Sequence, residues 1–117
     1  MSVVERLLPL TADVALTVDG PKAGTLAGEP IESSIVLFAA GGTEIGIWEC
    51  TPGSWTSSKD GFGELMHFVS GRGFITDADG RWEIRPGAVR WFPDGWTGTW
   101  EIDTVVRKVY VLVNTES

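Results

Sequence analysis

The sequence predicts one all-β domain in the form of a closed or nearly closed antiparallel barrel. Its 117 residues, of which 43% are apolar, 21% charged and 10% aromatic, suffice for one compact core and not for two. Fifteen Gly and six Pro make turns frequent and long helices rare. About eight or nine short runs rich in β-branched and aromatic residues, separated by turn residues, have the spacing typical of such barrels.

The expected elements follow in chain order. Residues 17–29 are rich in Gly and turn formers and lack an apolar period, which predicts a surface loop. Residues 33–40 and 43–50 read as two strands of a hairpin joined by Gly41 and Gly42. Asp79 and Gly80 mark a tight turn within residues 73–84. The remaining strands are expected over residues 64–71, 73–84, 88–92, 97–102 and 104–113.

Charge and composition exclude several classes of partner. Sixteen acidic against nine basic residues give a net charge of -7, which repels phosphate backbones, so we expect no nucleic-acid partner. The first twenty residues carry Glu5 and Asp13 and lack a basic head followed by an apolar run, so they do not resemble a secretory signal. No apolar stretch is long enough to span a membrane. We therefore expect a cytoplasmic protein without a membrane partner. The single cysteine, Cys50, cannot form a disulfide within the chain, and we expect it to be a buried structural thiol.

Two spaced motifs carry a resemblance to a known family. The first is E-x6-G from Glu64 to Gly71, and the second is G-x5-P-x-G from Gly87 through Pro93 to Gly95. This pair resembles the motifs of the cupin superfamily, which are jelly-roll-like barrels of two antiparallel sheets. Three flanking stretches resemble the single-domain subfamily named after (S)-ureidoglycine aminohydrolase: GIWECTPGSW, RPGAVRWFPDGWTGTWEI and VRKVYV. The resemblance implies one cupin-like domain over residues 1–117, with its motifs within 46–113.

The resemblance also implies where a metal ion would bind. Metal-binding cupins use the motif Glu together with three further ligands that are mostly His. Counting back from Glu64 puts two of these positions at Ser58 and Asp60, and counting forward from Gly95 puts the last at Gly98. Two carboxylates without an imidazole form a weak site for a transition metal. We therefore expect a divalent transition metal to lack its His ligands, and Glu64 and Asp60 remain the candidate catalytic carboxylates.

His67 is the single histidine of the chain. Because side chains alternate faces along a strand, His67 is expected to point away from the side of Glu64. A metal site of Asp60, Glu64 and His67 would need a bulge in this strand. Packing between sheets or at a subunit contact is the alternative role for His67.

The six tryptophans suggest a ligand pocket. If Gly98 faces the barrel interior, alternation also turns neighbouring aromatic residues inward, beside apolar residues on the face of Glu64. Aromatic walls and one carboxylate suit a small ligand with a polar or cationic group. The predicted pocket consists of Glu64, Met66, Phe68, Trp96 and Trp100. The alternative is that the indoles fill the barrel.

Two pairs of neighbouring residues must divide between the two faces of their strands. Trp48 and Glu49 cannot both line the interior, and Arg107 and Lys108 cannot both do so. One member of the basic pair could bind an anionic substrate. A buried Glu49 would need a cation such as Arg72, Arg90 or Arg107.

Two functions from different classes remain open. The first is the binding of a small molecule by a cupin. Under this function the protein could also be a metal-independent or weakly metal-binding enzyme that acts on a small polar nitrogen-containing metabolite, such as a ureide. The second is a non-catalytic module for dimerisation or regulation with a Trp-filled barrel. For the second, the apolar run SIVLFAA at residues 34–40 is a candidate interface strand of a homodimer.

Overall fold

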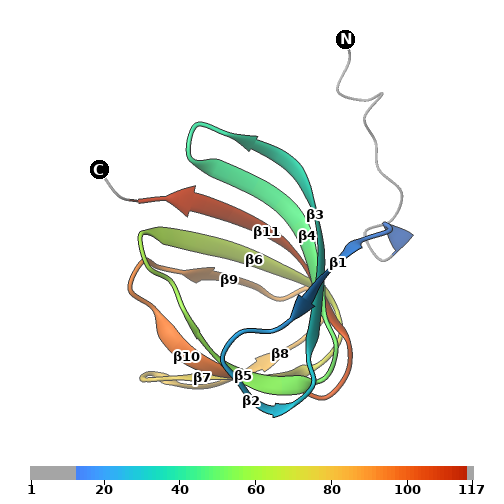
Figure 1. Cartoon of the computed structure of the whole chain (residues 1–117). Coiled ribbons are helices and arrows are strands. Elements are labelled where there is room, and N and C mark those ends of the chain that lie inside the picture. Colours follow the sequence, from blue (N-terminus) through green and yellow to red (C-terminus); the bar gives the residue numbers. More distant parts are fainter. Residues whose placement is uncertain (1–12, 116–117) are drawn as a thin grey trace.

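The computed structural model describes residues 13–115 and confirms the predicted all-β fold of two antiparallel sheets (Figure 1). In these residues it has eleven strands and no α-helix. The six-stranded sheet has the order β1-β3-β4-β11-β6-β9, with β1 at Thr17–Pro21, β3 at Ile31–Ala40, β4 at Thr43–Cys50, β11 at Val106–Asn114, β6 at Phe62–Ser70 and β9 at Val89–Phe92. The five-stranded sheet has the order β2-β5-β10-β7-β8, with β2 at Thr25–Gly28, β5 at Gly53–Ser58, β10 at Thr97–Ile102, β7 at Gly73–Asp77 and β8 at Gly80–Ile84.

The segment 17–29, predicted to be a loop, instead contains the strands β1 and β2. Strand β1 pairs with β3, and β2 pairs with β5, each with a shift in register. Both strands are exposed along most of their length, so they show no apolar alternation. Backbone pairing with an existing strand forms them, and this pairing leaves no local signal in the sequence.

Strand β5, which lies in the five-stranded sheet between β2 and β10, was not predicted either. Its residues are GSWTSS, in which Trp55 is the one large apolar side chain. Strand β5 is nevertheless held along its full length by β10, from Gly53 opposite Ile102 to Ser58 opposite Thr97. This strand brings one wall of the barrel to the site described below.

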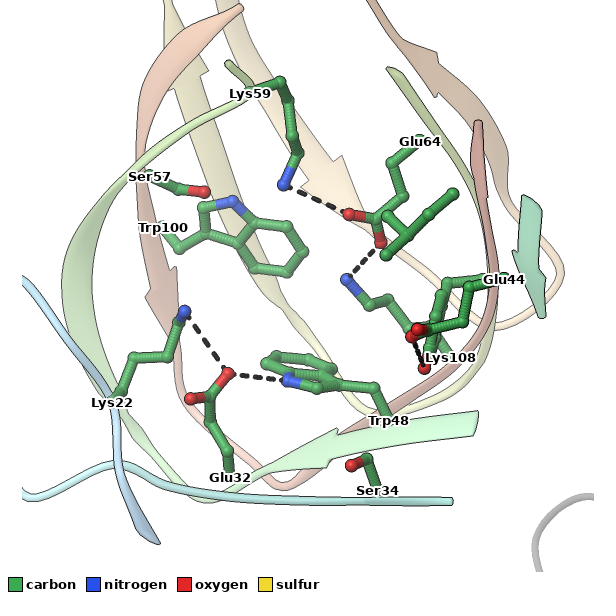
Figure 2. A pocket seen from close by; sticks show the side chains of 12 residues that line it. Lys22, Glu32, Ser34, Glu44, Trp48, Ser57, Lys59, Glu64, Trp100 and Lys108 are labelled. Atoms are coloured by element: carbon green, nitrogen blue, oxygen red, sulfur yellow. Dashed lines mark hydrogen bonds and ion pairs between the residues drawn. The ribbon is translucent and has the colours of Figure 1, made fainter. Parts of the chain in front are cut away.

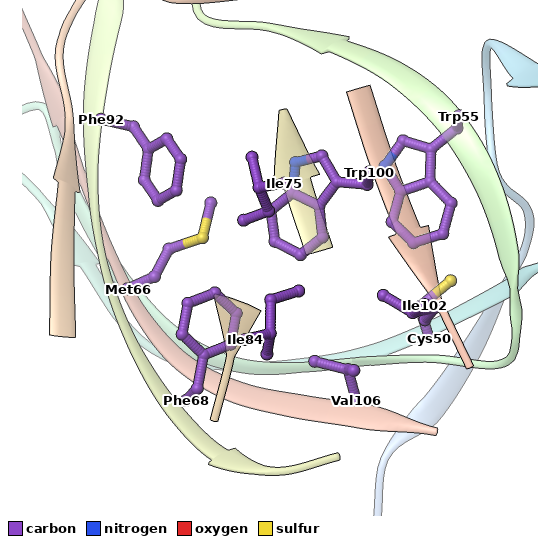
Figure 3. Packing of buried hydrophobic residues seen from close by; sticks show 10 residues of the cluster. All are labelled: Cys50, Trp55, Met66, Phe68, Ile75, Ile84, Phe92, Trp100, Ile102 and Val106. Carbon is purple, nitrogen blue, oxygen red and sulfur yellow. The ribbon is translucent and has the colours of Figure 1, made fainter. Parts of the chain in front are cut away.

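The hydrophobic core lies between the two sheets (Figure 3). The rings of Trp55 and Trp100 stack within it, with centroids 5.6 Å apart and 18° between their planes. Trp48 and Trp96 are partly buried and pack against this cluster. The core consists of Cys50, Trp55, Met66, Phe68, Ile75, Ile84, Phe92, Trp100, Ile102 and Val106.

Cys50 is fully buried in this core, as predicted. Burial raises the pKa of its thiol to about 12. Within residues 13–115, no helix has the length and apolar character needed to cross a membrane.

Candidate functional site

A pocket of about 230 Å³ lies inside the barrel, next to the core (Figure 2). Trp48 and Trp100 belong to both regions, because they pack in the core and also line the pocket. Sites for drug-sized ligands usually begin at about 300 Å³, so this volume suits a small metabolite. The pocket is lined by Lys22, Glu32, Ser34, Glu44, Trp48, Ser57, Lys59, Glu64, Trp100, Lys108, Tyr110 and Leu112.

Glu64 on β6 lies at the centre of a buried charged cluster. Its Oε1 is 3.1 Å from Lys59 Nζ, and its Oε2 accepts a hydrogen bond of 2.8 Å from Lys108 Nζ. The three residues are only 5 to 8% exposed. Burial raises the pKa of Glu64, but the ammonium groups of Lys108 and Lys59 lower it more, so the pKa lies below the ordinary value. Glu64 is therefore a carboxylate at neutral pH.

Lys108 on β11 reaches the pocket between two indoles. Its Nζ lies 4.4 Å from the ring centroid of Trp48 and 5.3 Å from that of Trp100. Met66 Sδ is 3.5 Å from the same nitrogen. Burial lowers the pKa of Lys108 below its ordinary value, and Glu64 opposes this effect. Ring faces attract a cation, so the two indoles and Glu64 together hold this ammonium group in place.

A second polar group forms the wall nearest β1 and β3. Glu32 Oε1 accepts a hydrogen bond of 2.8 Å from Trp48 Nε1 and lies 3.3 Å from Lys22 Nζ. Lys22 and Glu32 are 20% and 24% exposed, so this wall is less buried than the cluster around Glu64. The hydrogen bond to Glu32 orients the Trp48 ring against Lys108.

Tyr110 and Glu44 form a third wall. The Tyr110 hydroxyl donates a hydrogen bond of 2.8 Å to Glu44 Oε2. Burial and this acceptor both raise the pKa of Tyr110, so the phenol stays protonated. A Cβ atom at Gly46 would lie 2.5 Å from the Tyr110 hydroxyl, so only glycine at this position of β4 leaves room for the phenol.

The structure places the five residues of the predicted pocket in two regions. Glu64 and Trp100 line the pocket. Met66 and Phe68 share the inward face of β6 with Glu64 but are buried in the core, and Trp96 packs against the core. The pocket therefore lies to one side of the aromatic cluster, and the aromatic cluster fills the other part of the interior.

The structure does not bring Asp60 to Glu64. Ser58 and Asp60 are both exposed, whereas Ser57 and Lys59 face the pocket. The two residues that face Glu64 thus lie one position earlier in the sequence than the count from the motif predicted. Because strand side chains alternate, this shift of one residue replaces Ser58 and Asp60 by Ser57 and Lys59.

His67 and Gly98 have the orientations predicted for them, and neither can serve as a metal ligand beside Glu64. His67 is exposed on β6, between the buried Met66 and Phe68. A Cβ atom at Gly98 would lie 2.5 Å from the Trp96 ring and 2.7 Å from the carbonyl oxygen of Thr76. The Trp96 ring thus occupies the space that a side chain at position 98 would need.

The donor set around Glu64 does not fit a divalent metal ion. No group of three or more His, Cys, Asp or Glu side chains suited to a metal occurs in residues 13–115. Both oxygens of Glu64 already contact ammonium groups, which repel a cation and offer it no lone pair while protonated. The pocket chemistry is that of a carboxylate between two lysines.

Several pocket residues were not identified from the sequence. Lys108 could be found only as one of a pair, because alternation turns either Arg107 or Lys108 inward. The structure turns Lys108 inward. Arg107 lies 3.0 Å from Glu49 and is one of the three cations that were predicted as partners of Glu49. Lys59 had no signal, because it follows a strand that was not predicted.

Comparison with known proteins agrees with this fold. The sequence profile of the EutQ-like cupin domain matches residues 37–110. A protein of unknown function from Pseudomonas syringae pv. tomato is 25% identical, with a TM-score of 0.76 over 86% of this chain and 45% of that chain. This chain therefore spans less than half the length of that relative.

Two further solved structures share the fold at lower identity. A predicted oxalate decarboxylase from Thermotoga maritima is 14% identical, with a TM-score of 0.68 over 92% of this chain and 99% of that one. The EutQ protein of Clostridium difficile is also 14% identical, with a TM-score of 0.65 over 75% and 71% of the two chains. A search of curated proteins finds no sequence match to this chain.

Proposed function

Because the chain belongs to the EutQ-like cupin domain family, we propose that it binds a small polar metabolite in the pocket beside Trp48 and Trp100, without a transition metal. The observation that carries this proposal is the carboxylate of Glu64 held between the ammonium groups of Lys59 and Lys108 inside a pocket. Buried charged groups are costly, and a barrel interior that serves packing alone is filled with apolar side chains.

The walls of the pocket favour a ligand that carries N–H groups. Within the described part of the chain, Glu32 makes both of its contacts through Oε1, and Glu44 accepts from Tyr110 through Oε2. The other oxygen of each carboxylate can accept an N–H from a ligand. The resemblance to the (S)-ureidoglycine aminohydrolase subfamily makes ureides and other small nitrogen-containing metabolites the first compounds to test.

If the protein is an enzyme, acid/base chemistry would use Glu64 as the proton acceptor. Its lowered pKa keeps it ionised at neutral pH, which is the form that can accept a proton, and the same ammonium contacts make it a weak base. The neighbouring ammonium groups would stabilise negative charge that develops on the substrate. This assignment places the chemistry on Glu64 and leaves Asp60 outside it.

A thermal-shift screen of small ureides, amides and amino acids in buffer with a chelator tests the proposal. A ligand that binds only the folded state stabilises it, by about 2.7 kcal/mol at a hundred times its Kd. We expect at least one compound to raise the melting temperature of the wild type and not that of Glu64→Gln. Glu83→Gln, which changes a more exposed carboxylate on β8, is the matched control. A screen in which no compound shifts the wild type contradicts the proposal.

A specific feature of β3 favours a second function, the formation of a homodimer. Strand β1 pairs only with the first half of β3, from Ile31 to Ser34, within the described residues. Along the second half, Ile35, Val36, Leu37 and Phe38 are 36 to 53% exposed. An apolar strand edge of this kind can pair with the same edge of a second copy around a two-fold axis.

The oligomeric state in solution tests this second proposal. We expect light scattering after size exclusion to give the mass of a dimer for the wild type and of a monomer for Phe38→Lys. Leu26→Lys, at an even more exposed position on β2 in the other sheet, should leave the mass unchanged. A monomeric wild type at high protein concentration would rule out the dimer.

A further inference from the structure

One polar group of the pocket lacks a partner. The indole nitrogen Nε1 of Trp100 is buried and has no hydrogen-bond partner among the described residues. Trp100 itself is only 2% exposed. Its counterpart Trp48 donates to Glu32. Buried donors are nearly always paired, so an unpaired one in a pocket wall indicates that a ligand supplies the acceptor.

The unpaired donor lies beside two further donors. In Figure 2 the indole nitrogen of Trp100 is on the edge of the ring that points toward Ser57 and Lys59. The register supports this arrangement, because Trp55 lies opposite Trp100 and Ser57 is the next residue of β5 on the same face. Ser57, Lys59 and Trp100 line the same pocket.

The charge of this corner suits an anion. Two lysines, Lys59 and Lys108, contact the single carboxylate of Glu64, so this corner has more basic than acidic groups. A lysine has three N–H donors, and the Nζ of Lys59 contacts Glu64 through one of its oxygens. Lys59 therefore retains donors for a second anion.

We propose that this corner is a carboxylate-binding subsite, in which the oxygens of the ligand accept hydrogen bonds from Lys59 Nζ, Trp100 Nε1 and the Ser57 hydroxyl. The inference rests on the proposed function and names its substrate class: a small carboxylic acid whose other end carries N–H groups for Glu32 and Glu44.

Titration of the ¹⁵N-labelled protein tests the subsite through the indole N–H signals in the NMR spectrum. The probes are glycolate and its neutral amide, glycolamide, which differ in charge and little in size. The signal of Trp100 is identified by its loss in Trp100→Phe. We expect glycolate to shift this signal in a saturable way and glycolamide to bind at least tenfold more weakly, since hydrogen bonds to a charged group are stronger than those to a neutral one.

Two variants that each remove one positive charge provide the matched comparison. Lys59→Met should weaken glycolate binding at least tenfold, whereas Arg85→Met, which removes an exposed charge outside the pocket, should change it by less than about threefold. Unchanged positions of the other indole signals show that each variant is folded. Equal binding of glycolate and glycolamide, or an unmoved Trp100 signal, overturns the subsite. Either result leaves the proposed function to be decided by the metabolite screen, which does not require a carboxylate.

Discussion

Glu64 determines the electrostatics of the pocket, because it is the carboxylate that contacts both buried lysines. Its two contacts, 3.1 Å to Lys59 and 2.8 Å to Lys108, use both of its oxygens. Removing one member of a buried ion pair leaves an uncompensated charge in a region of low polarisability. The cluster is therefore sensitive to which member is changed.

Glu64→Gln should destabilise the protein by about 3–5 kcal/mol, because it leaves two buried ammonium groups close together without a counter-charge. Adding Lys108→Met should restore much of this loss, because only Lys59 then remains charged. Urea unfolding of the wild type, the two single variants and the double variant measures the coupling. Additive effects of the two substitutions would contradict this account of the cluster.

The buried thiol of Cys50 should be unreactive in the folded protein. With its pKa raised to about 12, the thiolate fraction at pH 8 is about 1 in 10,000. A colorimetric thiol reagent should therefore react slowly with the native protein and rapidly after unfolding in urea. Rapid reaction under native conditions would show that Cys50 is accessible.

The sequence predicted the strands whose side chains alternate between apolar and polar, and it did not predict those that form by backbone pairing alone. The alternation in β6, with Glu64, Met66 and Phe68 inward, and the hairpin of β3 and β4 were predictable from apolar patterns. Strands β1, β2 and β5 were not, because they carry little apolar pattern and depend on strands distant in sequence.

The failure at β5 explains what was missed in the site. Glu64 was predictable from its motif, but the residues that face it depend on the register of β5, which no local pattern shows. A shift of one residue exchanges Ser58 and Asp60 for Ser57 and Lys59, and this exchange replaces a carboxylate by an ammonium group. The predicted site therefore contained two carboxylates, whereas the site in the structure contains one carboxylate between two lysines.

Within β10, Gly98 is required by a close approach and not by a turn. Gly98→Ala should destabilise the protein by about 1–3 kcal/mol, because the added Cβ would meet the Trp96 ring and the backbone of β7. Thr97→Ala, at the exposed preceding position, is the control. Thermal unfolding of both variants measures the difference, and a neutral Gly98→Ala would show that the Trp96 ring moves away at little cost.

The barrel divides into a packed part and a pocket, and polar contacts between the two sheets connect its two sides. One such contact joins Asp77, at the end of β7 in the five-stranded sheet, to Arg90 on β9 in the six-stranded sheet, at 2.6 Å. The indole nitrogen of Trp96 donates to the same oxygen at 2.9 Å. Strand β9 is an edge strand of its sheet and β7 lies next to the edge strand β8 of the other, so this contact links the two sheets on that side.

This inter-sheet contact should make the stability of the protein depend on pH in acid. The hydrogen bond from Trp96 and that from Arg90 lower the pKa of Asp77 well below its ordinary value, although burial opposes them. The folded state thus binds the proton less tightly than the unfolded state does. The contribution of ionised Asp77 to stability is complete above the pKa of about 3.9 that it has in the unfolded state. This contribution is lost as the pH falls toward the lower pKa of the folded state.

Asp77→Asn should lower the free energy of unfolding by about 2 kcal/mol at neutral pH, since an amide accepts weaker hydrogen bonds than a carboxylate. It should also flatten the loss of stability in acid, although Glu64, whose pKa is lowered too, keeps part of the slope. Urea unfolding across the acid range measures both effects, with the exposed Asp79→Asn in the same turn as the control. If Asp77→Asn and the wild type lose stability in parallel as the pH falls, Asp77 does not link the two sheets through its charge.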